Sequence, residues 1–300
     1  MVYTSYDQII QRAKGKMVKS RMAVVSAADS HTIEAVVRAW RDGICDPILI
    51  GDEKKIRELL LKEGADPEKF EIYNETDDSV AAQKAVDLVH AGEAQSIMKG
   101  LIQTADFMRA IVKKENNLRL GSTICMMGIR EVPRYHKLLA FADCGICMYP
   151  TLEQKKEIIQ SCVDTLVNLG FDTPKVGCLG SVEVVNPKMQ DTVDSAELKR
   201  MNQAGEITNC IVEGPISYDL AVNKEAGEIK GYDSPVCGDA DLLVFPDLTS
   251  ANICTKALSH TSGKPAAVLI VGTKVPVIAC SRASSMETKY LCIAVAAARG

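Results

Sequence analysis

The segment RMAVVSAADSHTIEAVVRAWRDG, residues 21–43, contains both parts of a repeating pattern that decides the fold. Its first part, residues 21–28, is a short apolar run that predicts a buried strand. Its second part, residues 31–43, has apolar residues at helical spacing and ends at Gly43, as helices commonly do. A strand that leads directly into a helix is the unit from which parallel sheets are built.

The same alternation continues along the chain and predicts an α/β fold with mostly parallel sheets covered by helices on both faces. Further strands are predicted at residues 46–52, 70–74, 95–100, 175–181, 209–215, 241–247, 266–272 and 277–280. Further helices are predicted at residues 53–64, 79–92, 104–116, 151–170, 252–260 and 286–298. Thr151 and Gln154 have the spacing of a capping box at the start of one of these helices.

The length of the chain predicts two domains, because 300 residues are many for a single core. Residues 122–150 form a more strand-like interval, and we expect the join between the domains near residues 130–150. We expect a first α/β domain of residues 1–135 and 275–300, and a second of residues 136–274. Ligands of such folds bind beyond the carboxyl ends of the strands, so we expect a cleft between the domains.

The composition argues against nucleic acids and membranes as partners. The net charge is −4 and aromatic residues make up 5% of the chain, which disfavours both a basic surface and base stacking. No stretch reaches the roughly 18 to 20 apolar residues that a membrane span needs. The first twenty residues are polar and lack the apolar core of a signal peptide. We therefore expect a cytoplasmic protein.

Eleven cysteines are present, and most of them lie in apolar runs. In a reducing compartment such cysteines behave as small buried hydrophobic residues. Cys144 and Cys147 have CxxC spacing, which also fits a redox-active pair or half of a zinc site. No second pair completes four zinc ligands, and residues 138–150 are better interpreted as a buried strand.

The segments that follow four predicted strands carry the hydroxyl groups, amides and cations of a candidate site. These segments are Ser26 to Thr32; Lys99 with Thr104 and Arg109; Asp247 with Asn252 and Lys256; and Ser281 with Arg282. A helix N-terminus next to a fixed cation binds anions, and the planar fork of arginine suits phosphate oxygens. The simpler alternatives are a helix cap at residues 26–32 and solvated surface charges at the lysines and arginines.

Motifs of several enzyme classes are missing from the sequence. There is no GxGxxG, GxxxxGK[ST], HExxH or GxSxG, and the four histidines form no metal-like pair. The residues alone therefore predict a two-domain α/β protein whose cleft binds an anion, such as phosphate or a phosphorylated substrate.

Four segments carry a resemblance to a known family. They are IMKGLIQTADFMRAIV (97–112), VEGPISYDLAV (212–222), GDADLLVFPDLTSANICTKAL (238–258) and VGTKVPVIACSRASSMETKY (271–290). Together they resemble the phosphate acyltransferases, which comprise phosphate acetyltransferases and phosphate butyryltransferases. The resemblance covers nearly the whole chain, and the MKG and EGPISYD segments are more similar to the butyryltransferase branch.

The resemblance implies a reversible exchange between acyl-CoA plus phosphate and acyl phosphate plus CoA. It implies two α/β domains related to the isocitrate and isopropylmalate dehydrogenases, and a homo-oligomer that is at least a dimer. It requires no metal and no cofactor, since CoA is a substrate. We expect direct attack of phosphate on the thioester in a ternary complex.

The family also implies roles for particular residues. Its strand-final Ser-Arg pair lies in the active site and matches Ser281 and Arg282, and its functional arginine in the TADxxR helix matches Arg109. A carboxylate shortly after the Ser-Arg pair is the proposed base for the CoA thiol. The position seven residues after Ser281 is Thr288, so the nearest carboxylate, Glu287, is the expected base.

Two other functions remain open at this stage. An NAD-dependent and metal-dependent dehydrogenase of the related fold would need a set of aspartates such as Asp239, Asp241 and Asp247. A non-catalytic acyl-CoA-binding paralogue would be consistent with Thr288 in place of the carboxylate. Ser284 and Glu287 have capping-box spacing, so Glu287 has a purely structural alternative as well.

Overall fold

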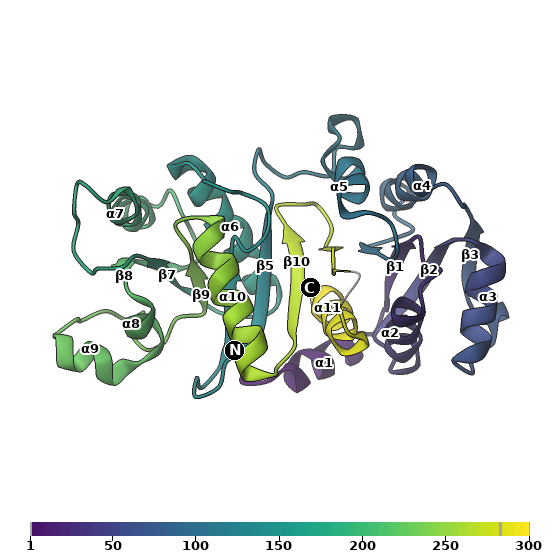
Figure 1. Cartoon of the computed structure of the whole chain (residues 1–300), viewed down its shortest axis with the longest axis horizontal. Coiled ribbons are helices and arrows are strands. Elements are labelled where there is room, and N and C mark those ends of the chain that lie inside the picture. The colour runs from purple at the N-terminus through teal and green to yellow at the C-terminus, as the bar shows by residue number, and fades with distance from the viewer. Residues whose placement is uncertain (1, 282–283, 300) are drawn as a thin grey trace. The chain divides into compact units, whose positions relative to one another are not determined.

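The structure is a computed structural model, and it describes residues 2–281 and 284–299. The chain divides into two compact units. Unit 1 contains residues 2–6 and 121–266, and unit 2 contains residues 7–120 and 267–299. The chain thus passes between the units after residues 6, 120 and 266, whereas the predicted domains had boundaries after residues 135 and 274. Each unit is a mixed α/β structure with mostly parallel strand pairs (Figure 1).

Unit 2 is built on six strands. In spatial order they are β3 (Glu71–Asn74), β2 (Cys45–Gly51), β1 (Ser20–Val25), β4 (Ser96–Lys99), β11 (Val277–Ile278) and β10 (Ala266–Val271). All neighbouring pairs are parallel except β10 with β11. The helices are α1 (Tyr6–Lys14), α2 (Ser30–Arg41), α3 (Glu53–Lys62), α4 (Asp78–His90), α5 (Thr104–Val112) and α11 (Met286–Ala298), with short 3₁₀ turns at Pro67–Lys69 and Lys114–Asn116. Figure 1 shows α4 and α5 on one side of these strands and α2 and α11 on the other.

Unit 1 is built on five strands. In spatial order they are β5 (Cys125–Glu131), β6 (Leu138–Ala142), β9 (Leu242–Val244), β7 (Lys175–Leu179) and β8 (Ile211–Ile216). β5 and β6 form an antiparallel hairpin, and the other neighbouring pairs are parallel. The helices are α6 (Leu152–Asn168), α7 (Gln190–Gln203), α8 (Tyr218–Val222), α9 (Lys224–Lys230) and α10 (Leu248–Ser262). Sequence reasoning had assigned no element to α7, α8 or α9.

The capping box and the terminal glycine that the sequence predicted are found at the helix ends. Thr151 and Gln154 form the full capping box of α6, which satisfies two backbone N–H groups at the helix start. Gly43 follows α2 with φ +66°, a left-handed conformation that glycine adopts without steric cost. These contacts explain why the predicted helix boundaries agree with the structure to within a few residues.

The last helix, α11, forms part of the core of unit 2. From Lys289 to Ala298 every one of its residues is buried, and it packs on α2. A helix that is apolar on all sides is stable only when other elements surround it. Within residues 2–281 and 284–299, none of the helices has the length and apolar content that crossing a bilayer requires.

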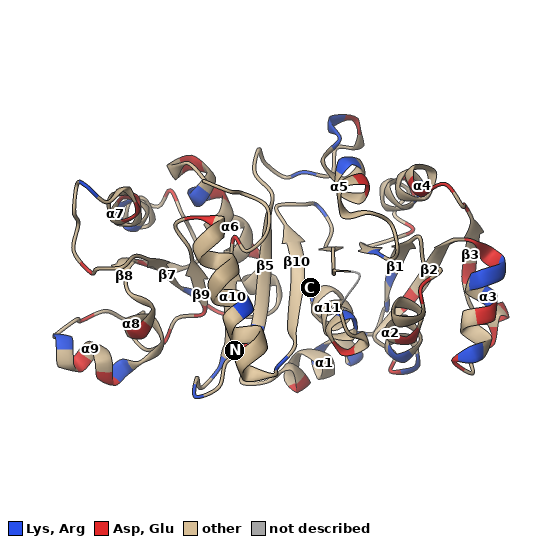
Figure 2. Cartoon of the chain, in the orientation of Figure 1, with Lys and Arg blue, Asp and Glu red and all other residues tan. Residues whose placement is uncertain are grey.

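Charged residues of both signs are intermixed on the outer helices. Figure 2 shows positive and negative residues side by side along α3, where Arg57 Nε lies 2.8 Å from Glu53 Oε1. Such exposed pairs contribute little to stability, but they keep the helix surface close to neutral.

The CxxC segment is not a strand, so the prediction for residues 138–150 was wrong in its second half. β6 ends at Ala142, and the carboxylate of Asp143 then accepts backbone N–H groups from Gly145, Ile146 and Cys147, which fold the segment into a turn. Burial raises the pKa of Cys144 to about 12 and that of Cys147 to about 11. Thiols with such pKa values stay protonated at neutral pH and react slowly.

Candidate functional site

Three of the four predicted site segments begin at one edge of unit 2. Val25 at the end of β1 pairs with Lys99 at the end of β4, and Met98 pairs with Ile278 of β11. Because these strands are parallel, the residues that follow them leave the sheet at the same edge. The structure therefore brings the chain after Val25, the chain after Lys99 and the chain before Ser281 close together.

The backbone is closely packed at this edge. The N–H groups of Gly100 and Leu101 donate to the carbonyl oxygens of Val25 and Ser26 at 2.8 and 2.9 Å. A Cβ atom on Gly100 would lie only 2.4 Å from the carbonyl oxygen of Ser26. Ser26 has φ +52° and donates its hydroxyl to Asp78 Oδ1 at 2.6 Å. The ends of β1 and β4 can therefore approach this closely only because residue 100 has no side chain.

Residues 26–32 include the helix cap that the simpler alternative expected. Asp29 is the N-cap of α2, and its carboxylate accepts the backbone N–H of Thr32 at 2.9 Å. The Thr32 hydroxyl also donates to Asp29, at 2.5 Å. Burial would raise the pKa of Asp29, but the hydrogen bonds from Thr32 and the charge of Lys289 lower it.

Lys99 is not a solvated surface charge. It is 1% exposed, and its Nζ donates to the carbonyl oxygen of Gly100 at 3.2 Å. A fully buried ammonium group is uncommon in proteins, and such lysines are found with partners or at functional sites. The simpler alternative for Lys99 was therefore wrong, and a fixed cation lies at the strand edge.

Lys289 is a second buried cation at this edge, and sequence reasoning missed it. It is 1% exposed, and its Nζ lies 2.9 Å from Thr32 Oγ1 and 3.2 Å from Asp29 Oδ2. Its only signal in the sequence is a single charged residue at the head of the apolar run 290–298. Helical spacing does not distinguish such a residue from an exposed lysine near a helix N-terminus.

Cys280 directly precedes Ser281 and interacts electrostatically with Lys99 and Lys289. Its Sγ lies 3.2 Å from the Sγ of Cys292 on α11. The hydrogen bond with Cys292 lowers the pKa of the Cys280 thiol most, burial opposes this, and the charges of Lys289 and Lys99 lower it further. The positive charges of both lysines thus act on Cys280, the residue before Ser281.

Ser281 is exposed, and its carbonyl oxygen accepts the N–H of Ser284 at 3.0 Å. Arg282, which was predicted to hold phosphate, lies outside the described residues. The cap of α11 is Ser285, whose hydroxyl accepts the N–H of Thr288 at 3.2 Å. The capping box expected from Ser284 and Glu287 was therefore wrong.

Glu287, the expected base, lies in the first turn of α11 and forms an ion pair with Arg38 of α2. The guanidinium of Arg38 lies 3.9 Å from the centre of the Tyr290 ring, so it is held on two sides. Burial would lower the pKa of Arg38, but the hydrogen bond and charge of Glu287 raise it. The pair is about half exposed, which leaves the carboxylate accessible to solvent.

Thr104 and Arg109 lie on α5 in unit 2. Thr104 is the first residue of the helix and is exposed, and Arg109 is exposed and donates to Asp106 Oδ1 at 2.6 Å. Arg109 lines a cavity of about 490 Å³ between α4 and α5, together with Asp77 and Asp106. This cavity is lined by carboxylates as well as by Arg109 and Lys113, and Asp106 accepts a hydrogen bond from only one nitrogen of the Arg109 guanidinium.

Asp247, Asn252 and Lys256 all belong to α10 in unit 1. Asp247 is the N-cap, and its carboxylate accepts the N–H of Ser250 at 2.9 Å. Asn252 is half-buried and Lys256 is exposed, and their spacing of four residues places them on one face of the helix. The three residues thus form a second group, separate in the chain from those of unit 2.

Comparison with known proteins identifies the family. The phosphate acetyl/butaryl transferase family matches residues 5–87 and 76–297. The phosphate acetyltransferase of Thermotoga maritima is 42% identical over 294 residues, which cover 97% of this chain and 98% of the relative. The chain belongs to this family. The phosphate butyryltransferase of Clostridium acetobutylicum is 40% identical over 293 residues, which cover 98% of this chain and 97% of the relative.

A solved structure agrees with the family assignment. A branched-chain phosphotransacylase from Enterococcus faecalis V583 is similar with a TM-score of 0.81 at 28% identity, over 93% of this chain and 98% of that chain. The family and the enzyme class that the sequence predicted, a phosphate acyltransferase, are therefore confirmed. The relative from Thermotoga maritima is named for the acetyl group, whereas the relative from Clostridium acetobutylicum is named for the butyryl group.

Proposed function

We propose that this chain catalyses the reversible transfer of a short-chain acyl group, with butyryl favoured, from acyl-CoA to phosphate. Family membership supports the reaction class. The observation that carries the proposal is the buried cation Lys99 at the sheet edge from which the chain enters Ser281. A positive charge at the strand edge that also carries an exposed hydroxyl suits a phosphate next to a thioester carbonyl.

The proposed reaction is a direct transfer. An oxygen of phosphate, held by Arg282 and Arg109, attacks the carbonyl carbon of the thioester, while the buried Lys99 contributes its positive charge to substrate binding. The carbonyl oxygen becomes a tetrahedral oxyanion, which the hydroxyl of Ser281 stabilises by a hydrogen bond. The C–S bond then breaks and CoA leaves as a thiolate. Holding both reactants together removes translational and rotational entropy from the barrier.

In the reverse direction the CoA thiol must lose a proton before it attacks the acyl phosphate. Glu287 is the proposed base, because it is the nearest carboxylate after Ser281. Thr288 has no acid–base function in this scheme, and its N–H is already bound to the Ser285 cap. Arg38 orients the Glu287 carboxylate through their ion pair.

The remaining features follow from the same proposal. Thr104, Asp247, Asn252 and Lys256 contribute to substrate binding, and CoA is a substrate, so that no cofactor is needed. The protein acts in the cytoplasm as a homo-oligomer, at least a dimer. A cleft of the isocitrate dehydrogenase type stays a prediction.

The positions of three aspartates give less support to the alternative function, a metal-dependent dehydrogenase. Asp239 pairs with Lys137 at 2.8 Å, and Asp241 pairs with the same lysine at 2.7 Å, both ahead of β9. Asp247 caps α10 beyond the other end of that strand. Carboxylates already engaged by a lysine, and separated by the length of a strand, do not converge on one metal ion.

The test is phosphate-dependent release of free thiol from acetyl-, propionyl-, butyryl- and hexanoyl-CoA by the purified protein. We expect release that requires phosphate and is fastest with butyryl-CoA. Arg282→Ala should raise the KM for phosphate, and Ser281→Ala should lower kcat by about 10²-fold or more. Ser284→Ala, a substitution of the next serine along the chain, is the matched control.

Each alternative predicts a different outcome of this assay. Thiol release without phosphate would indicate a hydrolase. CoA binding without turnover of any acyl-CoA would indicate the non-catalytic paralogue. Phosphate-dependent release that is fastest with acetyl-CoA would keep the reaction and correct the acyl preference.

A further inference from the structure

Cys280 and Cys292 bring two thiols together next to the candidate site of unit 2. Cys280 follows β11 and directly precedes the exposed Ser281, and Cys292 lies in the middle of α11. Their sulfur atoms are 3.2 Å apart, and the two residues are 4% and 0% exposed. The sulfur atoms of a disulfide are about 2.05 Å apart, so an approach of about 1.2 Å is enough to form the bond.

The surroundings of Cys280 favour its thiolate form. The hydrogen bond with Cys292 lowers the pKa of Cys280 most, burial opposes this, and the charges of Lys289 and Lys99 lower it further. The same hydrogen bond raises the pKa of Cys292, whose S–H donates to the Cys280 thiolate. The thiolate is the form of cysteine that acts as a nucleophile. The pair therefore consists of one nucleophile, Cys280, and one thiol that keeps its proton, Cys292.

A second close pair of thiols lacks these cations. Cys125 and Cys162 in unit 1 are both buried, and their sulfur atoms are 3.8 Å apart. The hydrogen bond with Cys162 raises the pKa of Cys125 most, burial raises it further, and the charge of Asp143 acts in the same direction. This pair has thiols close together without a nearby positive charge, so it serves as an internal comparison.

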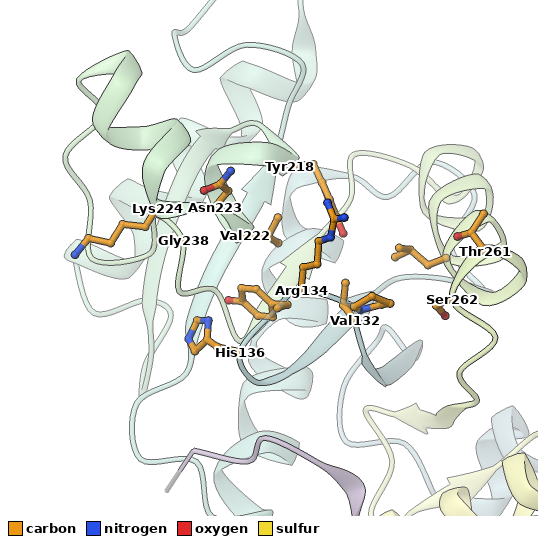
Figure 3. A pocket seen from close by; sticks show the side chains of 13 residues that line it. Val132, Arg134, His136, Tyr218, Val222, Asn223, Lys224, Gly238, Thr261 and Ser262 are labelled. Atoms are coloured by element: carbon orange, nitrogen blue, oxygen red, sulfur yellow. The ribbon is translucent and has the colours of Figure 1, made fainter.

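Cys237 in unit 1 lies beside a cavity but has no such surroundings. It is half-buried, and the residue that follows it, Gly238, lines a cavity of about 900 Å³ (Figure 3). None of the 13 described residues that line this cavity contains a sulfur atom. Burial raises the pKa of Cys237, and the charges of Glu228 and Asp219 raise it further. Cys237 is thus more accessible than Cys280, but no second thiol lines the cavity beside it.

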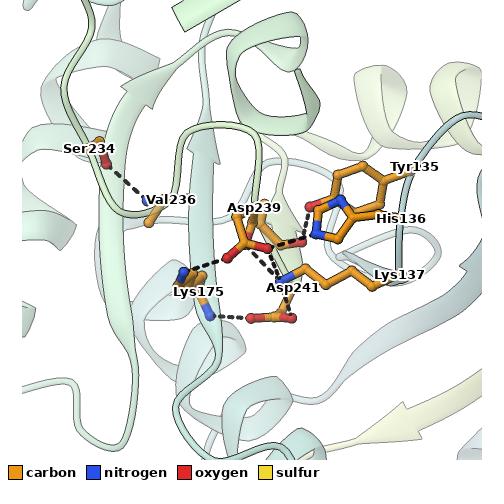
Figure 4. Close-up of polar contacts among 9 residues, drawn as sticks. Tyr135, His136, Lys137, Lys175, Ser234, Val236, Asp239 and Asp241 are labelled. Carbon is orange, nitrogen blue, oxygen red and sulfur yellow. Dashed lines mark hydrogen bonds and ion pairs between the residues drawn. The ribbon is translucent and has the colours of Figure 1, made fainter. Parts of the chain in front are cut away.

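The basic residues of this part of unit 1 are bound to Asp239, two residues after Cys237. Figure 4 shows Lys137, Lys175 and His136 around the Asp239 carboxylate. Burial would raise the pKa of Asp239, but these hydrogen bonds hold it at about 2. Because Asp239 compensates their charge, these residues do not lower the pKa of Cys237.

We propose that Cys280 and Cys292 are an oxidation site, at which a hydroperoxide converts the two thiols into a disulfide that slows acyl transfer. The disulfide itself is inferred from the distance between the sulfur atoms and from the nearby lysines. Its effect on the rate rests on the function proposed above for Ser281. In a reducing compartment such a disulfide is transient, as those of redox sensors are.

Two steps give the disulfide. The Cys280 thiolate attacks one oxygen of the hydroperoxide, so that an S–O bond forms, the O–O bond breaks, and the leaving group takes up the proton that the thiol released. Cys280 is then a sulfenic acid, oxidised by two electrons, and the hydroperoxide is reduced to water or an alcohol. The sulfur of Cys292 next attacks the sulfur of Cys280, the S–S bond forms, the S–O bond breaks, and hydroxide leaves with the Cys292 proton as water.

The disulfide changes the position of Ser281, because Ser281 is bonded directly to Cys280. Cys292 is held by its helix and by the N–H of Val268, which donates to its sulfur at 3.1 Å. Most of the approach of about 1.2 Å therefore falls on Cys280 at the end of its strand. A misplacement of about 1 Å can lower the rate of a reaction between bound groups about 10²-fold.

The test treats the reduced protein with hydrogen peroxide, removes the oxidant by gel filtration and analyses the tryptic peptides without reduction. Cys280 and Cys292 lie in different tryptic peptides, residues 275–282 and 290–299. We expect these two peptides to be joined in a product that lacks two hydrogen atoms and that dithiothreitol separates. The peptides of the comparison pair, residues 120–130 and 157–175, should stay unlinked.

Acyl transfer is measured on the same samples after gel filtration. We expect the rate to fall about tenfold or more and to return after reduction. Cys292→Ser, whose hydroxyl can still accept the N–H of Val268, should keep the rate of the reduced parent and form no linked peptide. Its Cys280 should remain a sulfenic acid that dimedone labels. Cys237→Ser is the matched control and should respond to peroxide as the parent does.

Three results would overturn the proposal. They are peroxide treatment that oxidises Cys237 but leaves Cys280 and Cys292 as thiols, linkage of residues 120–130 to 157–175 that is at least as fast, and a complete Cys280–Cys292 disulfide with an unchanged rate. The linked peptide is detected without any substrate. Its formation in a protein that transfers no acyl group would therefore support the oxidation site and contradict the proposed function.

Discussion

The ammonium group of Lys289 lies 3.2 Å from the carboxylate of Asp29, although 260 residues separate them in the chain. The contact joins the last helix of unit 2 to the N-terminus of α2, directly behind the strand edge that carries Lys99. Because Lys289 is fully buried, the pair holds α11 at one position against α2.

We predict that Lys289→Met destabilises the protein by about 2 kcal/mol, because Asp29 loses its partner while it remains partly buried. The free energy of unfolding in urea measures this change. Lys54→Met, a substitution of an exposed lysine on α3, should stay within about 0.5 kcal/mol of the parent. If the two substitutions change the free energy of unfolding equally, the buried pair of Lys289 and Asp29 does not contribute to stability.

The network around Asp239 predicts a pH dependence of stability. The pKa of Asp239 in the folded state is about 2, below its ordinary value of 3.8. A lowered pKa in the folded state adds stability that is complete above the unfolded pKa and is lost as the pH falls through the folded pKa. The parent should therefore lose about 1 kcal/mol more than Asp239→Asn between pH 5 and pH 2, after allowance for solvent screening.

Urea unfolding at several pH values, with both proteins side by side, measures this difference. Asp52, whose pKa is also lowered, is partly exposed at the start of α3, and Asp52→Asn is the control for general charge effects at low pH. If the Asp239→Asn variant and the parent lose stability in parallel as the pH falls, the ion pairs of Asp239 do not stabilise the folded state.

Gly100→Ala should destabilise the protein by about 3 kcal/mol, since the new Cβ atom would lie 2.4 Å from a backbone oxygen of Ser26. Gly92→Ala is the matched control. It has φ +73° and nothing within 4 Å of the added atom, so it should cost about 1 kcal/mol through its backbone conformation alone. Thermal and urea unfolding measure the loss of stability in each variant. A loss in Gly100→Ala no larger than that in Gly92→Ala would show that the strand ends separate easily.

Glu287→Gln tests the proposed base. We expect kcat for acyl transfer to CoA to fall by about 10²- to 10⁴-fold, while stability changes by less than about 1 kcal/mol because the pair with Arg38 is half exposed. Glu53→Gln on α3 removes a similar carboxylate from an exposed arginine pair and should leave kcat unchanged. A rate within twofold of the parent would show that another group, or water, accepts the thiol proton.

The strand and helix pattern was readable from the sequence because each buried strand is followed by a periodic helix with a cap or a terminal glycine. The strand edge was also readable, since parallel strands place Ser26, Lys99 and Ser281 at the same side of a sheet. The α7, α8 and α9 helices were missed because the segment that contains them is polar and has little apolar periodicity.

Two features of the structure could not be predicted from local patterns. Lys289 looks like any lysine near a helix start, and only the packing of α11 on α2 buries it. Arg130 follows Ile129 in a strand whose alternation does not reveal that Arg130 is buried, with no hydrogen-bond partner for its Nε among the described residues. Both depend on residues more than a hundred positions away in the chain, which single-sequence reasoning does not place.

The composition of unit 2 from residues 7–120 and 267–299 has a consequence during synthesis. When the ribosome has made the first 120 residues, β4 still lacks its neighbour β11, and α2 still lacks the apolar helix α11. Most of unit 1 leaves the ribosome before those last residues do. The unit whose first strands are made earliest is therefore completed after most of unit 1, and its apolar surface stays exposed until residues 267–299 have been made.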